Sequence, residues 1–213
     1  MTLRGLTTTT TVVLLAVAGG SLHAQGISLG GRLGLIGGEA VFDSKEANDL
    51  QQPIPGLQIG GVLRYRSHSV LGLQAELWYV QKGWIETRAG GGRRLSYVEL
   101  PLFLTLTAPW TTAPQLLAGA SGSLELDCSV TGVPDVGSVS CDDPRVAWQH
   151  RKAQLATWAG VGVRRRVGAS QVDVHLLVGL NLTNLNREPL PLGYTRLLSL
   201  AVSAAYLVPL GGR

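Results

Sequence analysis

The segment QVDVHLLVGLNL, residues 171 to 182, alternates between two kinds of side chain. Every second residue from Val172 to Leu182 is aliphatic, whereas most of the residues between them are polar or small. Successive side chains of a β-strand point to opposite faces, so the segment predicts a strand with one wholly apolar face. The other face carries Asp173 and His175 and is too polar to be a second protein core. Such a strand fits a sandwich, or a barrel whose outside meets lipid.

The same one-sided alternation returns along most of the chain. In VLGLQAELWY, residues 70 to 79, leucines and Ala75 oppose Gln74 and Glu76. Each segment of this kind is close to the roughly 9 to 11 residues with which a tilted strand crosses a bilayer. The eight segments are residues 27–37, 56–66, 70–81, 95–107, 114–125, 156–167, 171–183 and 195–208.

The connections between these segments alternate in length. Three are short, at residues 67–69, 108–113 and 168–170. The others are long and polar, at residues 38–55, 82–94, 126–155 and 184–194. Aromatic residues are expected to form two belts at the rims, with Tyr65, Trp110 and Tyr206 at one and Tyr79, Trp84 and Tyr194 at the other. Together these features predict an all-β fold, an eight-stranded antiparallel transmembrane β-barrel of the outer-membrane type.

The N-terminal region has the pattern of an export signal. Arg4 precedes a short apolar core, Val12 to Ala18, and small residues lead to a cleavage site after Ala24. We therefore expect a signal peptide over residues 1–24 and a barrel domain over residues 25–213, located in the outer membrane of a Gram-negative-type bacterium. The formal charge of +4 falls to +3 when Arg4 is removed, and this dispersed charge argues against a nucleic-acid partner.

Two residues interrupt the apolar run LSYVELPLFLTL, residues 95 to 106. A barrel accommodates Glu99 because its leucines face lipid while Glu99 faces the lumen. Pro101 removes one ladder donor, so a local bulge is expected there. We expect Glu99 to pair with a lumen arginine, Arg64 being the first candidate. The lumen charge network predicted from the inward rows comprises Arg32, Arg64, Glu76, Glu99, Arg164, Asp173 and His175.

Cys128 and Cys141 lie in one polar segment rich in Gly, Asp and Ser. In an exported chain such a pair is expected to be oxidised, so we predict a disulfide in the third outer loop. Neither cysteine has a nearby pair of histidines, which argues against a metal site. No cofactor is expected either.

Three segments resemble the PorT-like outer-membrane β-barrel proteins. SYVELPLFLTL is similar to that family's signature of tyrosine, acidic residue, proline and leucine, YVQKG to the exit of its third strand, and GGRLGL to its glycine-rich first strand. The resemblance implies an eight-stranded barrel, with links in some members to secretion or gliding machinery. Family members commonly end on an aromatic residue that helps the insertion machinery. Here Tyr206 lies seven residues before the end.

No catalytic motif is recognisable in the mature chain. His68, His150 and His175 are expected in a turn, a loop and the lumen, and no G-x-S-x-G or phosphate loop is found. A channel is disfavoured because the interior of an eight-stranded barrel is just wide enough to be filled by side chains.

The sequence therefore favours a non-enzymatic membrane scaffold whose extracellular loops serve binding, adhesion or envelope integrity. The alternatives are a lipid-modifying outer-membrane enzyme and a component of a secretion system. The expected partners are outer-membrane lipids, the barrel insertion machinery and an unidentified extracellular or periplasmic partner.

Overall fold

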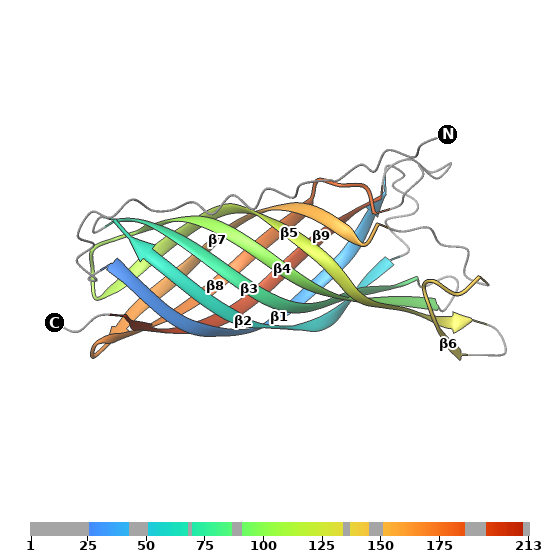
Figure 1. Cartoon of the computed structure of the whole chain (residues 1–213), viewed down its shortest axis with the longest axis horizontal. Helices are drawn as coiled ribbons and strands as arrows, with labels where there is room; N and C mark the ends of the chain where they lie inside the picture. Colours follow the sequence, from blue (N-terminus) through green and yellow to red (C-terminus); the bar gives the residue numbers. More distant parts are fainter. Residues whose placement is uncertain are drawn as a thin grey trace, which may run out of the picture.

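The computed structural model describes residues 26–42, 51–67, 70–86, 91–133, 137–144, 151–185 and 195–210. These residues form one antiparallel sheet that curls into a barrel (Figure 1). The barrel strands are β1 (Ile27–Phe42), β2 (Gln51–Arg66), β3 (Leu71–Glu86), β4 (Gly91–Thr107), β5 (Thr112–Val133), β7 (Ala153–Val167), β8 (Ser170–Asn181) and β9 (Thr195–Pro209). A short strand, β6 (Gly137–Ser140), pairs with the far end of β5.

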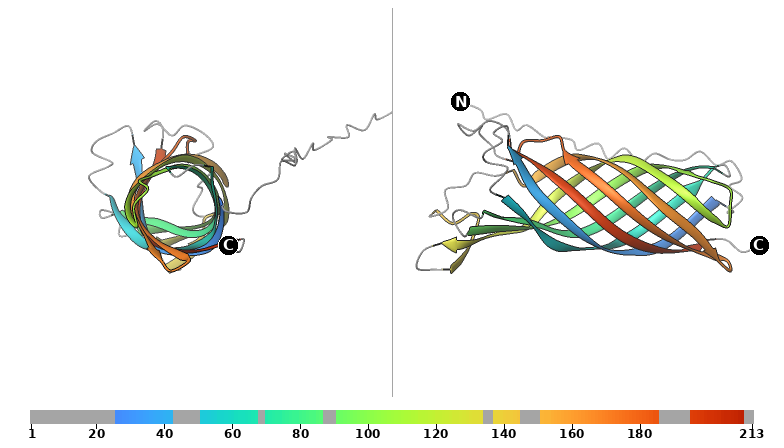
Figure 2. Two further views of the ribbon diagram at one scale, coloured as in Figure 1. Left: turned by 90° about the vertical axis from the view of Figure 1, so that its left-hand side faces the viewer. Right: turned by 180° about the vertical axis from the view of Figure 1, so that it is seen from behind.

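The barrel closes because its first and last strands pair. β1 and β9 run antiparallel from Ser28 opposite Pro209 to Phe42 opposite Thr195. The remaining order is β4-β3-β2-β1-β9-β8-β7-β5, and β4 and β5 pair with each other to complete the ring (Figure 2). The eight-stranded antiparallel barrel predicted from the sequence is confirmed.

The alternation along each strand separates lipid-facing from lumen-facing residues. On β4, Leu100, Leu102 and Leu104 have exposed fractions of 53%, 59% and 47%, whereas Glu99 and Phe103 are 1% exposed. Large aliphatic side chains rarely form so continuous an exposed surface on a soluble protein. The outer surface is therefore the one that contacts the hydrocarbon of the membrane.

The two ends of the barrel differ. At one end, here called the turn end, β2 and β3, β4 and β5, and β7 and β8 are joined by short turns, so these strands end almost level. The strands differ in length, and this difference appears at the opposite end, here called the loop end. In outer-membrane barrels the short turns face the periplasm and the long loops face outward.

The strands extend farther at the loop end than predicted. Residues 82–94, expected as a loop, include the end of β3 at Glu86 and the start of β4 at Gly91. About half of the connection expected at residues 126–155 is also strand, because β5 continues to Val133, β6 follows, and β7 begins at Ala153. The apolar alternation ends where the outer face leaves lipid, but backbone pairing does not depend on lipid, so the ladder continues beyond it.

Pro101 causes no bulge. The β3 to β4 pairing keeps one register from Ala75 opposite Leu102 to Trp78 opposite Glu99. The register shift on the other side of β4 lies at Ser96 and Tyr97 instead. A proline removes a hydrogen-bond donor but adds no residue, so the register on either side is preserved.

The structure bears out the expected aromatic belt at the turn end, but not the position of Trp84 in the other belt. Tyr65, Trp110 and Tyr206 are exposed at the turn end, as the belt requires. Trp84 is only 3% exposed, so its assignment to the outer belt was wrong. It has the same parity on β3 as Trp78 and therefore points inward. Tyr194 lies outside the described residues, as do the expected signal peptide and its cleavage site. Within the described ranges no helix is long and apolar enough to span a membrane.

Leu77 and Ile85 provide a test of the membrane position. Both have exposed side chains of the same parity on β3, but Ile85 lies eight residues nearer the loop end. A charge near the bilayer midplane costs about 2–4 kcal/mol, against about 0–1 kcal/mol near the interface. We expect Leu77→Arg to lower the free energy of unfolding in lipid bilayers far more than Ile85→Arg. Equal losses would contradict the assigned membrane position.

Candidate functional site in the barrel lumen and at the loop end

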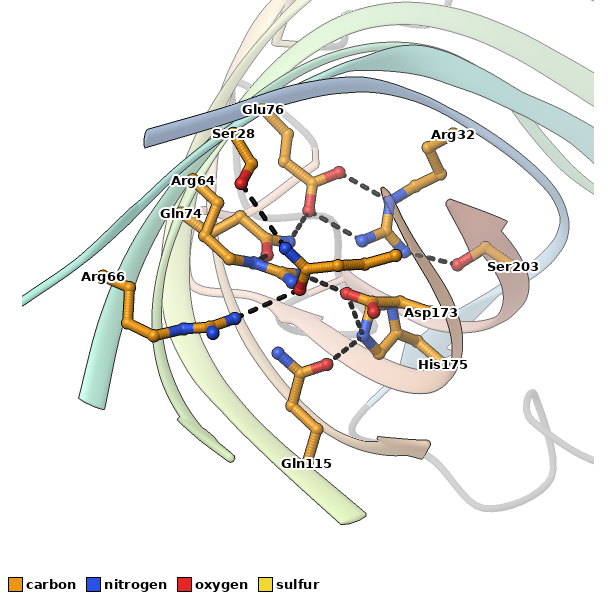
Figure 3. A network of polar contacts seen from close by, with 11 residues as sticks. Ser28, Arg32, Arg64, Arg66, Gln74, Glu76, Gln115, Asp173, His175 and Ser203 are labelled. Atoms are coloured by element: carbon orange, nitrogen blue, oxygen red, sulfur yellow. Dashed lines mark hydrogen bonds and ion pairs between the residues drawn. The ribbon is translucent and has the colours of Figure 1, made fainter. Parts of the chain in front are cut away.

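A network of polar side chains fills the lumen toward the turn end (Figure 3). Arg32 on β1 donates two hydrogen bonds to Glu76 on β3, from Nε to Oε2 at 2.6 Å and from Nη2 to Oε1 at 2.8 Å. Its third nitrogen, Nη1, donates to Ser203 Oγ on β9 at 2.5 Å. Both charged side chains are completely buried. A paired guanidinium and carboxylate with two parallel bonds is the geometry best able to offset the loss of water around two charges.

A second ion pair crosses the lumen at the same level. Arg64 on β2 pairs through Nη2 with Asp173 Oδ2 on β8, and its Nε donates to Gln74 Oε1 at 2.6 Å. His175 on β8 lies with Nε2 4.0 Å from Asp173 Oδ2 and 2.8 Å from Gln115 Oε1 on β5. Strands far apart in the barrel are thus connected through its interior.

Arg164 on β7 belongs to the same end of the lumen. It lies directly opposite Asp173 on the β7 to β8 ladder and is 0% exposed. Its Nη2 donates to the carbonyl of Ala108 in the β4 to β5 turn at 3.3 Å.

An aromatic layer crosses the middle of the lumen. The indole rings of Trp78 and Trp158 meet edge to face at 5.5 Å, and Phe103 lies 6.0 Å from Trp78. Trp78 Nε1 donates to Glu76 at 2.6 Å, toward the turn end, and Trp158 Nε1 donates to Glu99 at 2.8 Å, toward the loop end. Each indole is therefore bonded to a different polar network, and the aromatic layer separates the two.

Glycines opposite the tryptophans make room for this layer. Gly60 is paired with Trp78 and Gly179 with Trp158 on the neighbouring strands. A Cβ added at Gly179 would lie 2.6 Å from the Trp158 ring, and one at Gly60 would lie 2.8 Å from the Trp78 ring. These small inward-facing residues therefore lie opposite bulky ones and leave room for their rings.

Glu99 has a different partner from the one predicted. Its Oε2 accepts a bond from Lys82 Nζ on β3 at 3.0 Å, and its Oε1 accepts one from Ser121 Oγ on β5 at 2.6 Å. The ammonium group of Lys82 also lies 5.2 Å from the centre of the Trp158 ring. The predicted pair of Glu99 with Arg64 is wrong.

The strand register explains the error. Arg64 lies opposite Gln74 on β3, whereas Glu99 lies opposite Trp78, four residues nearer the loop end. The aromatic layer fills the level between the two charges. Lys82, four residues beyond Trp78, points into the lumen on the same side of the layer as Glu99. Its inward parity could have identified it, but residue 82 was assigned to a loop.

The structure places all seven residues predicted for the lumen inside the barrel, each 2% exposed or less. It divides them into two groups. Glu99 lies on the loop side of the aromatic layer, and the other six lie on the turn side: Arg32, Arg64, Glu76, Arg164, Asp173 and His175. The inward residues that the sequence reasoning did not select as site residues include Gln74, Trp78, Lys82, Gln115, Ser121 and Trp158.

The lumen near the loop end is filled by an apolar cluster. Its members include Ile36, Ala40, Val80, Trp84, Leu95, Tyr97, Leu177, Leu185 and Leu197. The cluster is continuous with the aromatic layer, because Trp78, Phe103 and Trp158 also belong to it. The predicted disulfide joins Cys128 to Cys141, with Cα atoms 5.4 Å apart, and both residues belong to this cluster. The disulfide therefore closes the β5 to β6 hairpin at its base, and both of its cysteines are buried in this cluster.

The lumen is thus occupied at three levels by a polar network, an aromatic layer and an apolar core. Side chains fill the narrow interior of an eight-stranded barrel in this way. Among the residues described, no group of three or more His, Cys, Asp or Glu side chains could hold a metal ion. His175 is buried and bonded, and His68 and His150 lie outside the described ranges.

Comparison with known proteins identifies the family. A model described as "Outer membrane protein beta-barrel domain" matches residues 23–184, which is more than half of the chain. The chain belongs to this outer-membrane β-barrel family. It is accordingly an outer-membrane protein of a Gram-negative-type bacterium, and its lipid-facing leucines lie in that membrane. No curated protein matched the chain.

Solved outer-membrane proteins are among the structures that the chain matches. Neisserial surface protein A is 11% identical, with a TM-score of 0.50 over 85% of this chain and 97% of that one. The attachment invasion locus protein Ail of Yersinia pestis is 13% identical, with a TM-score of 0.47 over 86% and 99% of the two chains. OprG of Pseudomonas aeruginosa is 10% identical, with a TM-score of 0.48 over 88% and 98%. At 11% identity the likeness to Neisserial surface protein A is one of fold alone.

The buried pair of Lys82 and Glu99 can be compared with the exposed pair of Lys152 and Asp142. The Lys152 and Asp142 side chains are 52% and 65% exposed, those of the buried pair 4% and 1%. Breaking a buried pair from one side typically costs about 3–5 kcal/mol, whereas an exposed pair contributes about 0–1 kcal/mol. Glu99→Gln should therefore destabilise the barrel much more than Asp142→Asn in denaturant unfolding.

Adding Lys82→Met to Glu99→Gln should restore part of that stability, because no uncompensated charge then remains. Equal unfolding midpoints for Glu99→Gln and Asp142→Asn would show that Glu99 contributes no more than a surface charge.

The disulfide gives a separate prediction. Cys128 and Cys141 are 13 residues apart, and closing a loop of this size stabilises a protein by about 3 kcal/mol in the chain-entropy model. We expect the unreduced, denatured protein to resist thiol labelling. Reduction should lower the stability of the hairpin, measured by hydrogen exchange of β6, while leaving the turn-end strands protected. Labelling of both cysteines before reduction would reject the bridge.

Proposed function

We propose that this family member is a non-enzymatic scaffold that presents its loop end outside the cell, for binding, adhesion or envelope integrity. The observation that supports this most directly is the filled lumen. Charged pairs, the aromatic layer and the apolar core occupy the space that transport would need. An eight-stranded barrel filled in this way has its outer face in lipid and its two ends as the surfaces available to other molecules.

The loop end is the better developed of these two surfaces. β3, β4 and β5 extend past the ends of neighbouring strands there, and β6 adds a further pairing to β5 (Figure 1). The disulfide closes the base of the β5 to β6 hairpin, where both cysteines are buried, and so restrains the projection. This restraint lowers the entropy that the projection loses when a partner binds, so the construction suits a recognition surface.

The finer family assignment is part of the same proposal. The segment SYVELPLFLTL, which resembles PorT-like proteins, forms the lipid face and lumen wall of β4, with Glu99 and Pro101 both pointing inward. This supports the proposal that β4 is built here as in the PorT-like proteins. Interactions with outer-membrane lipids and the insertion machinery are expected of such a barrel and are part of the proposal. An extracellular or periplasmic partner stays a prediction.

Conductance provides the first test. The purified protein, reconstituted in planar bilayers, should produce no regular stepwise current, because the lumen is occupied at three levels. Stable open-channel currents of uniform size would contradict the scaffold proposal and favour a pore.

Loop replacement provides the second test. Bacteria producing the protein should lose adhesion to surfaces or resistance to detergent when residues 129–140 are replaced by a short Gly-Ser turn. The matched control replaces residues 108–111 in a turn-end connection, and it should keep both properties. If the hairpin variant inserts normally and behaves as the unaltered protein in both assays, the hairpin has no presenting role.

A further inference from the structure

The lumen near the turn end contains more positive than negative charge. Five arginines project from the inward rows of β1, β2 and β7 on this side of the aromatic layer: Arg32, Arg64, Arg66, Arg164 and Arg166. Among the residues that the structure describes, the inward carboxylates at the same end are Glu76 and Asp173. Five arginines against two carboxylates leave a formal excess of three positive charges, and this excess is located on β2 and β7.

Pairing within the lumen does not neutralise this excess. Glu76 is held by Arg32, and Asp173 by Arg64. Arg66 donates to the neutral side chain of Gln171 at 3.1 Å. The guanidinium of Arg164 is within electrostatic range of Arg66 and Arg166 as well as of Asp173. Like charges at this separation repel one another, and an anion between them would offset that repulsion.

Buried donors without partners point to the same place. Arg164 is 0% exposed, and its Nε and Nη1 have no hydrogen-bond partner in the described part of the chain. Nη1 of Arg64 and Nε2 of Gln115 are also buried and unpartnered there. A buried donor left without a partner costs about 1–3 kcal/mol, and more when it is charged. Such donors are normally satisfied by water or by a ligand.

Access is possible from the turn end. Arg166 is exposed and Arg66 is half-buried, whereas Arg164 lies two residues deeper on β7 than Arg166. The outer arginines would meet an incoming anion first, and Arg164 would bind it behind them. The acceptor Asp173 Oδ1 is also unpartnered at this level, which favours a ligand that carries a proton as well as negative charge. Hydrogen phosphate and phosphate monoesters have that chemistry.

We propose that Arg66, Arg164 and Arg166 form a phosphate-binding site at the periplasmic mouth of the lumen. The ligand class is a compact phosphate oxyanion that can carry a proton, supplied either as free phosphate or as the phosphomonoester headgroup of a lipid of the inner leaflet. The site lies at the opposite end of the barrel from the proposed presenting surface, so it adds a second binding function.

Equilibrium dialysis with inorganic phosphate tests the proposal on the full-length folded protein in detergent. We expect saturable binding that weakens about three- to tenfold in Arg166→Gln and in Arg66→Gln, since each removes a charge-assisted hydrogen bond. Arg164→Gln should abolish it. The matched control is Arg165→Gln, because Arg165 is adjacent in sequence but has outward parity with Val163 and Val167, and it should bind as the unaltered protein does.

A bilayer experiment distinguishes the two sources. Nanodiscs containing phosphatidic acid are compared with nanodiscs of phosphatidylcholine alone, and lipid retained by the protein is measured after exchange. Retention of phosphatidic acid that depends on Arg166 but not on Arg165 supports a headgroup site, and phosphate binding in detergent with no such retention supports a free phosphate. The proposal is overturned if neither ligand binds, or if Arg165→Gln weakens binding as much as Arg166→Gln. Arg166 is exposed, so this comparison holds even if Arg164→Gln fails to fold.

Discussion

The constraint on which the structure depends is the need to satisfy every backbone hydrogen bond inside lipid. A strand edge left open in hydrocarbon would leave a row of N–H and C=O groups without partners, at several kcal/mol each. The pairing of β1 with β9 removes that edge. Once the ring is closed, alternation assigns half of the side chains to lipid and half to a narrow lumen, and the lumen must be packed as tightly as any protein core.

The lumen meets this requirement with different chemistry at different depths. Charged and polar side chains fill the turn side, where Arg32 and Glu76 share two bonds. Apolar side chains and the disulfide fill the loop side, as in a soluble domain. Trp78 and Trp158 connect the two regions. Their rings pack against each other, while the Trp78 N–H donates to Glu76 on the turn side and the Trp158 N–H donates to Glu99 on the loop side. The barrel is therefore built as a solid body with two usable ends, as the proposed functions require.

The fold could be predicted from the sequence because apolar residues alternate with a period of two in eight segments, a pattern that few other folds would produce. The inward position of Glu99 followed from the same parity. Its partner did not, because pairing across a lumen depends on the stagger between strands, which alternation leaves undetermined. Lys82 was missed since the apolar pattern fades outside lipid, where hydrogen bonding alone continues the strand. The unpartnered donors of Arg164 depend on side-chain positions from several strands, which no local pattern encodes.

The contacts of Arg32 have a consequence for how the chain folds. Its partners Glu76 and Ser203 lie 44 and 171 residues away along the sequence. The guanidinium therefore acquires its complete set of bonds only after the last strand has joined the first. Contacts between such distant residues make folding slow, because a long loop must close before they contribute any stability. The lumen network is therefore completed late in folding. Until β9 pairs with β1, Arg32 on the first strand lacks its hydrogen bond to Ser203.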